Sequence, residues 1–564
     1  MTTKKTDREI DLELKREKEV QKKINERHER DRVAEKVARE RKPIHHCLTR
    51  RDFLSQGLIM GGGAFFTTGL SSLLTSNTAN ASLLQTHLGE LVTANNPILS
   101  IDLAGGANLL GGGAVVGFAD TENQLDVGTN SGSYIQLGIP SNLHPKNDAN
   151  VDSQFGLKFH RSSGFRQGLI DGIGHDPNDP ASPPDLAEYI DGVIACAVTA
   201  DDSAANAINP LYAINHVANN RGKLVAAVGT QPNAYGGKSV GPAQDMKAAW
   251  RPSNISVGNA EADAAGLVSV GRNIMEPGIL DALGPKGQFR LEKFMEIVGN
   301  ITKKDMDRVV GGRHQNTLVA NKIRSLANDS SKLFDTYGPE KLKPTDSEVV
   351  AHVQAIFGDG NGNISNNNMQ HAAIMNLIVK GIATTGTIQI GGADYHNGTN
   401  MTGYNVDRNA GLAVARFFRM CHAEERNGVA YICTDGGVRG NTAGQLDPDN
   451  GNVVWQGDSG ARSGIIILRY VHGVKRIDNP NGGSNLIYGK RQIGWYAENG
   501  GAQLGSSPFI NSPHLLTRLI TANYIASMLD TTDRDEARTI AGDIMIQKFG
   551  GDWKPSWNKY IRCC

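Results

Sequence analysis

The chain has 564 residues, including 66 glycines, and its 58 Lys and Arg residues balance 58 Asp and Glu residues. A glycine content near 12% without a three-residue period excludes a collagen-like fibre and predicts many tight turns. The zero net charge argues against a globally basic nucleic-acid-binding protein, and the length is ample for a large buried core.

The charges are segregated along the chain. Residues 1–48 contain 15 Lys and Arg and 11 Asp and Glu, and they are expected to form a charged helical extension. Residues 1–81 carry a net charge of +5 and residues 82–564 carry −5. The extension is expected either to be discarded with the segment that follows it or to serve as a cytoplasmic handle for a partner.

Residues 49–81 have the three-part layout of an export signal. The pair Arg50 and Arg51 precedes Phe-Leu, a weakly apolar stretch follows over residues 57–74, and residues 79–81 (Ala-Asn-Ala) fit a signal peptidase. The segment resembles a twin-arginine signal peptide, which implies the Tat export machinery as a partner and a periplasmic or extracellular mature chain. The alternative is an uncleaved membrane anchor, although eighteen glycine-rich residues barely span a bilayer.

Residues 82–564 alternate short apolar runs with helical patterns, which is typical of an α/β fold with a mostly parallel sheet. No apolar stretch in this part reaches transmembrane length, so we expect no membrane contact for the mature chain. A helix-rich insertion is expected at about 258–350. Strands are expected at 97–103, 189–199, 223–229, 387–390, 429–433 and 464–468, and closing helices at about 513–530 and 534–549.

The five cysteines after residue 81 form no disulfide framework, because their number is odd and their spacing is irregular. Cys196 and Cys433 lie in apolar runs and are expected in the core. Cys563 and Cys564 end the chain, and their redox role stays open.

Two glycine-rich segments do not fit nucleotide-binding patterns. The turn after Asp102 lacks the spacing of a dinucleotide-binding loop, and Asp102 is expected either to ligate a metal ion or to cap the turn. Residues 223–245 lack a P-loop glycine, because Pro232 stands in its place. Ser239 just before a helix start could act as a nucleophile towards phosphate or sulfate, or be an ordinary loop serine.

Acidic residues follow several predicted strands, at the sheet edge where ligands bind. Asp394 and His396 stand two apart after a strand, so their side chains can share one face and hold a divalent ion, or else form a hydrogen-bonded turn. Asp435 at the end of a predicted strand and Asp458 in an acidic turn before the next strand are further candidate metal ligands, and Arg439 is a candidate anion-binding residue.

Taken in order, these motifs resemble a family of twin-arginine-exported bacterial proteins of largely unknown function, related to the alkaline phosphatase and sulfatase superfamily. Five segments correspond to its motifs over about 360 residues: 103–108, 222–245, 391–396, 434–439 and 457–460. The resemblance implies a three-layer alkaline-phosphatase-like core. Three positions depart from the family pattern, since Asn108 replaces an acid and Val240 and Ser459 each replace a histidine.

The resemblance implies a metal-dependent hydrolase of phosphate or sulfate esters. Ser239 would be the nucleophile and Arg439 the anion clamp. Because three family residues are missing, one ion, an altered site or none remain open, with zinc, calcium, magnesium or manganese as candidates. The alternative is a non-catalytic periplasmic or cell-surface protein of the same fold, acting in secretion, envelope assembly or binding. The expected metal ligands are Asp394, His396, Asp435 and Asp458.

Overall fold

The structure is a computed structural model. It describes residues 96–199, 210–214, 225–230, 253–269, 339–529 and 533–562, except for single residues and short gaps within these ranges. All of them belong to one of the two units into which the chain divides, Gly61–Cys564. The predicted charged extension and export signal lie outside the described residues, as do Ser239, Asp435, Cys563 and Cys564.

The described residues form an α/β fold built on an eight-stranded sheet with the order β12-β4-β11-β8-β1-β7-β5-β6. The strands of this sheet are β1 (Ile98–Leu103), β4 (Ile190–Ala197), β5 (Val225–Gly229), β6 (Ser253–Asn254), β7 (Ala383–Gln389), β8 (Gly428–Thr434), β11 (Ser463–Tyr470) and β12 (Gln492–Ile493). All neighbouring pairs are parallel except the two that involve β11, which is antiparallel to both β4 and β8. The predicted mostly parallel α/β sheet is therefore confirmed.

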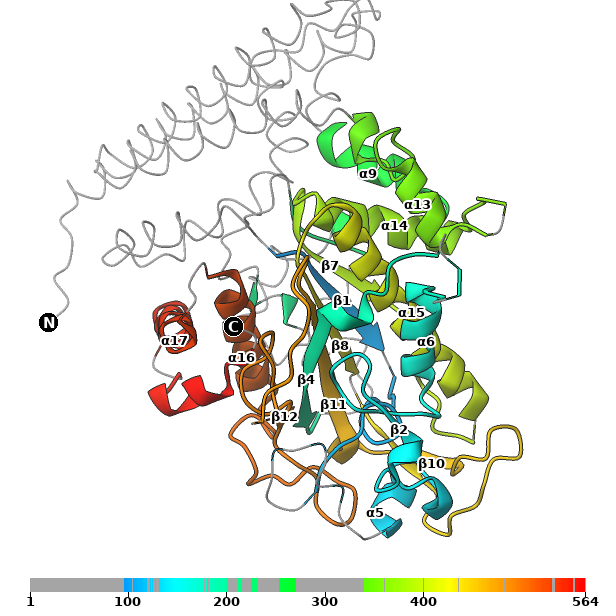
Figure 1. Cartoon of the computed structure of the whole chain (residues 1–564), viewed down its shortest axis with the longest axis vertical. Helices are drawn as coiled ribbons and strands as arrows, with labels where there is room; N and C mark the ends of the chain where they lie inside the picture. Colours follow the sequence, from blue (N-terminus) through cyan, green and yellow to red (C-terminus); the bar gives the residue numbers. More distant parts are fainter. Residues whose placement is uncertain are drawn as a thin grey trace, which may run out of the picture. The chain divides into compact units, whose positions relative to one another are not determined.

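Helices cover both faces of the sheet (Figure 1). One face packs against α6 (Gly164–Ile173), α14 (Asn366–Val379) and α15 (Asn400–Ala423), and the other against α16 (Pro513–Met528) and α17 (Arg534–Phe549). Strand β1 contributes to both layers because its side chains alternate, with Leu99 and Ile101 in one core and Ile98 in the other. This arrangement is consistent with a three-layer α/β fold.

The strand and closing-helix predictions agree with the structure to within a few residues, whereas α6, α14 and α15 were not predicted. Within the predicted insertion, the structure describes α9 (Ala260–Ser269) and a 3-10 turn at Pro339–Leu342, while α13 (Val350–Phe357) starts at its end. Residues 270–338 lie outside the described part of the chain. Cys196 and Cys433 are buried free thiols, as predicted, and Cys421 is a third.

Smaller elements lie outside the main sheet. They are α5 (Ser131–Ile135) and the two-stranded sheets β2 (Val151–Asp152) with β3 (Phe159–His160), and β9 (Val438–Gly440) with β10 (Trp455–Asp458). Among the described residues, no helix is both long and apolar enough to cross a membrane.

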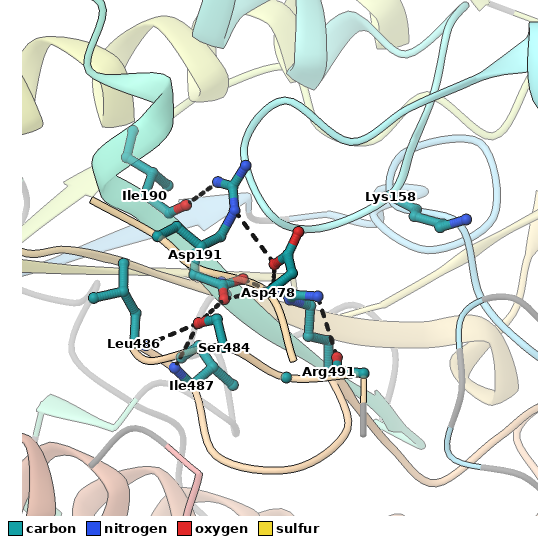
Figure 2. A network of polar contacts seen from close by, with 12 residues as sticks. Lys158, Ile190, Asp191, Asp478, Ser484, Leu486, Ile487 and Arg491 are labelled. Carbon is teal, nitrogen blue, oxygen red and sulfur yellow. Dashed lines mark hydrogen bonds and ion pairs between the residues drawn. The ribbon is translucent and has the colours of Figure 1, made fainter. Parts of the chain in front are cut away.

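A buried ion pair lies at the start of β4, at the amino ends of the parallel strands (Figure 2). Asp191 is fully buried, and Arg491 donates to both of its oxygens, from Nε at 2.7 Å and from Nη2 at 2.8 Å. The Ser484 hydroxyl donates to the same carboxylate at 2.5 Å. Both carboxylate oxygens therefore accept hydrogen bonds, which a buried charge requires.

Candidate functional site

The central strands β7, β1 and β8 end at the same level of the sheet. Asp102 in β1 is in register with Gln389 in β7 and with Cys433 in β8. The turn after β1 is tied to the end of β8, because the Ala107 amide donates to the Thr434 hydroxyl at 3.1 Å. The segments that follow these three strands therefore meet at one edge.

Asp394, His396 and Asp458 come together at this edge. One potential ligand atom from each residue lies within 4.8 Å of those of the other two. The His396 Nδ1 atom contacts the Asp394 carboxylate and lies 2.9 Å from an Asp458 oxygen. Asp394 and His396 follow β7, whereas Asp458 ends β10 and reaches the cluster because β10 pairs with β9, which follows β8.

The three side chains lie at the surface of the fold, with 57% of Asp394, 23% of His396 and 34% of Asp458 exposed. Two carboxylates that share one imidazole nitrogen repel each other unless a positive charge lies between them. One nitrogen and two carboxylate oxygens match the donor set of a three-ligand divalent metal site with an open position. Asp394 and His396 share one face as predicted, and their direct contact fits both the metal site and the hydrogen-bonded turn that the sequence left open.

Two glycines let the turn after β1 approach the cluster. Gly105 has a φ of +124°, and a Cβ atom built there would lie 2.7 Å from the Cβ of Asp394. Gly106 has a φ of +134°, and its added Cβ would lie 3.7 Å from an Asp458 oxygen. The missing side chains of the predicted Gly-Gly turn thus allow its backbone to lie close to Asp394 and Asp458.

Arginines lie beside the carboxylates. Arg439 is in β9, in register with Gly457 of β10, and its Nε atom is buried without a hydrogen-bond partner among the described residues. Arg462 donates to the Ser459 hydroxyl at 2.7 Å and to the Gln136 side chain at 2.6 Å. Burial lowers the pKa of Arg462, and the charge of nearby Arg439 lowers it further, although Tyr496 opposes this. Two arginines therefore lie close to each other near the turn that carries Asp458.

Other residues that the sequence singled out are buried, hydrogen-bonded or part of a short strand. Asp102 is buried at the end of β1. Asn108, which replaces the family acid, is also buried, and its amide donates to the Leu137 carbonyl at 2.6 Å. Ser459, which replaces a family histidine, accepts a hydrogen bond from Arg462. Asp458 was expected in a turn, but it closes a short strand, because the extended residues 455–458 pair with β9.

Two residues beneath the cluster were not singled out from the sequence. Tyr395 is buried between the two ligands of its loop, and its hydroxyl lies 3.1 Å from both carboxyl oxygens of Asp407. Burial raises the pKa of Asp407 to about 8, against the hydrogen bond from Tyr395, which lowers it. The alternation of Asp394, Tyr395 and His396 was the available signal, since an aromatic residue between two polar ones points inward.

Comparison of the chain with protein-family models, with curated proteins and with solved structures gives no match.

Proposed function

We propose that the protein is a metal-dependent hydrolase of phosphate or sulfate esters, with a fold of the alkaline phosphatase type. The convergence of Asp394, His396 and Asp458 within 4.8 Å carries this proposal. It joins residues from two motifs of the resemblance, although β10 lies far along the chain from β7. The position of the cluster at the carboxyl ends of parallel strands is where α/β proteins bind ligands.

The three ligands and Arg439 divide the chemistry between them. A divalent ion held by Asp394, His396 and Asp458 would polarise an ester oxygen and stabilise negative charge in the transition state. Arg439 is in register with Gly457, the neighbour of Asp458, and its charged guanidinium would bind a tetrahedral oxyanion. Ser239 remains the proposed nucleophile from the sequence.

Metal content and esterase activity test this proposal together. Protein purified without chelator should contain about one equivalent of a divalent metal per chain and hydrolyse p-nitrophenyl phosphate or sulfate. The double variant Asp394→Asn/His396→Ala should lose the metal and the activity. The matched control is Asp176→Asn/His175→Ala, an exposed Asp-His pair outside the cluster.

The same experiment separates the enzyme from a non-catalytic protein of this fold. Asn108 favours the non-catalytic alternative, because its amide is engaged with Leu137 where the related family has an acid. If the wild-type protein holds no metal and has no esterase activity, and the double variant does not differ from it, the result supports the non-catalytic alternative. That alternative is a role in secretion, envelope assembly or binding.

We further propose that residues 49–81 direct twin-arginine export to the periplasm or beyond. The support is the Arg50-Arg51 pair, the weakly apolar stretch and the Ala-Asn-Ala site in the sequence. Replacing both arginines with lysine should abolish cleavage after residue 81 and leave the precursor inside the cell. Processing that continues unchanged in the lysine variant contradicts this route.

A further inference from the structure

Tyr395 stands between two proposed metal ligands and points away from them. Its side chain is 1% exposed, whereas Asp394 and His396 lie at the surface. An alternating backbone places neighbouring side chains on opposite sides, so the two ligands face the cluster and the tyrosine faces the core. The position of the ligand-bearing loop therefore depends on what this buried ring contacts.

The Tyr395 hydroxyl joins two elements that flank the cluster. It accepts a hydrogen bond from the Asn108 backbone amide at 2.6 Å, in the turn after β1. It donates to the Asp407 carboxyl group in α15, 3.1 Å from each oxygen. Both the donor and the acceptor capacity of the hydroxyl are used, which fixes the ring against the β1 turn on one side and against α15 on the other.

The Tyr395 ring joins the third ligand to the same support. Its centroid lies 6.1 Å from that of Trp455, the first residue of the strand that Asp458 ends. The ring also packs on Gly403 of α15, where an added Cβ would lie 2.7 Å from it. The Tyr395 side chain thus contacts the elements that support the Asp394–His396 loop. It also contacts the strand that carries Asp458.

The surroundings of the Tyr395 hydroxyl argue against a direct role in substrate binding. The cavity that Tyr395 and Asp407 line has a volume of about 30 Å³, which is room for only a few water molecules. It is too small to hold a whole ester substrate beside the Tyr395 hydroxyl. The pair therefore acts on the site through the backbone and ring contacts.

We propose that Tyr395 and Asp407 form a positioning pair that sets the distance between Asp458 and the Asp394–His396 loop, and thereby the affinity of the site for a divalent ion. This inference rests on the proposed metal site. Partners behind the first ligands of a metal commonly contribute 10–100-fold to metal affinity. Here Asp407 would act through Tyr395, which lies between the ligands Asp394 and His396 in the sequence.

The test compares Tyr395→Phe, Asp407→Leu and Asp407→Asn with the full wild-type chain. Co²⁺ is the spectroscopic probe, because its visible absorption reports coordination geometry, and competition with a chromophoric chelator gives the Zn²⁺ affinity. Tyr395→Phe and Asp407→Leu should each weaken Zn²⁺ binding about 10–100-fold and change the Co²⁺ spectrum. Asp407→Asn should stay close to wild type, since its amide oxygen still accepts from Tyr395.

Tyr404→Phe is the matched control. Tyr404 lines the same cavity, but its hydroxyl makes no hydrogen bond to the part of the chain that the structure describes. It should leave both readouts unchanged. A loss of affinity in Tyr404→Phe equal to that in Tyr395→Phe would show a general packing effect and overturn the inference.

Hydrogen exchange on the metal-free protein separates this inference from the proposed function. Tyr395→Phe should speed exchange of the Asn108 amide, which loses its acceptor. If wild type binds metal and Tyr395→Phe has the same affinity and spectrum, the positioning pair is wrong and the metal site stands. If wild type binds no metal while Asn108 exchange responds as expected, the hydrogen bonds are real but the metal site, and with it the positioning role, is overturned.

Discussion

Gly105 lies directly behind Asp394, so that a Cβ atom at position 105 would come within 2.7 Å of the Asp394 Cβ and 2.9 Å of its backbone nitrogen. The turn after the central strand and the loop that carries two of the three clustered side chains are thus in contact at backbone distance. Strand β1 therefore shapes the cluster without contributing a ligand to the described geometry.

The substitution Gly105→Ala should damage both the fold and the site. Contacts under 3 Å with backbone atoms cannot be relieved by rotating a side chain, and the φ of +124° is unfavourable for alanine. We expect a loss of about 1–3 kcal/mol in the free energy of unfolding, together with weaker metal binding. Urea denaturation and Zn²⁺ titration measure the two effects.

Gly451→Ala is the control for backbone strain alone. Gly451 also has a positive φ, +69°, but no atom lies within 4 Å of its added Cβ. It should lose stability without losing metal affinity. Equal metal affinities for Gly105→Ala and wild type would contradict the close contact between the β1 turn and Asp394.

Removing the charge of Arg462 should destabilise the protein, whereas removing that of Arg439 should leave its stability nearly unchanged. The Arg439 Nε atom has no hydrogen-bond partner among the described residues, so Arg439→Gln should leave the free energy of unfolding within about 0.5 kcal/mol of wild type. Arg462 donates to Ser459, Gln136 and the Asn499 carbonyl, so Arg462→Gln should destabilise by about 1–3 kcal/mol. Thermal denaturation of both variants measures the difference.

Inhibition by inorganic phosphate then tests the role of Arg439 in anion binding. In an active protein, Arg439→Gln should weaken this inhibition at least tenfold while the fold remains intact, because a charge-assisted contact is lost. Unchanged phosphate inhibition in this stable variant would remove Arg439 from the anion site.

The substitution Arg491→Met should be among the most destabilising changes at the sheet edge opposite the cluster. It leaves the fully buried Asp191 without its counter-ion, and breaking a buried ion pair from one side costs about 3–5 kcal/mol. Urea denaturation gives the free energy of unfolding. The double variant Asp191→Asn/Arg491→Met should recover part of the lost stability, since no buried charge then remains. If the double variant has the same free energy of unfolding as Arg491→Met, the unpaired buried charge is not the cause of the loss.

Asp407 should make the protein less stable as the pH rises. Its pKa is about 8 in the folded protein and near 3.8 in the unfolded chain, so the folded state holds the proton more tightly. The stabilisation is fully present below pH 3.8 and is lost progressively as the pH rises to about 8. One group contributes a slope of at most about 1.4 kcal/mol per pH unit in this window.

Denaturation of wild type and Asp407→Asn between pH 5 and pH 9 measures this contribution. The difference in unfolding free energy between the two proteins should shift in favour of Asp407→Asn as the pH rises, because the amide does not ionise. Parallel pH profiles for the two proteins would show that Asp407 does not titrate in this range.

The sequence by itself determined the parts of this protein that depend on local pattern. Short apolar runs predicted the strands β1, β4, β5, β7, β8 and β11, because strands covered on both faces of a sheet are nearly continuously apolar. The alternating sequence around Tyr395 placed Asp394 and His396 on one face. Cysteines in apolar runs were correctly assigned to the core.

Only the tertiary structure decided which distant segments meet. Asp458 joins Asp394 and His396 because β10 pairs with β9, and strand pairing between such short segments leaves no periodicity to read. The antiparallel direction of β11 is likewise set by its neighbours β4 and β8. The Asp407 partner of Tyr395 and the Arg491 partner of Asp191 are side-chain contacts across separate elements, and their energies depend on burial that the folded chain creates.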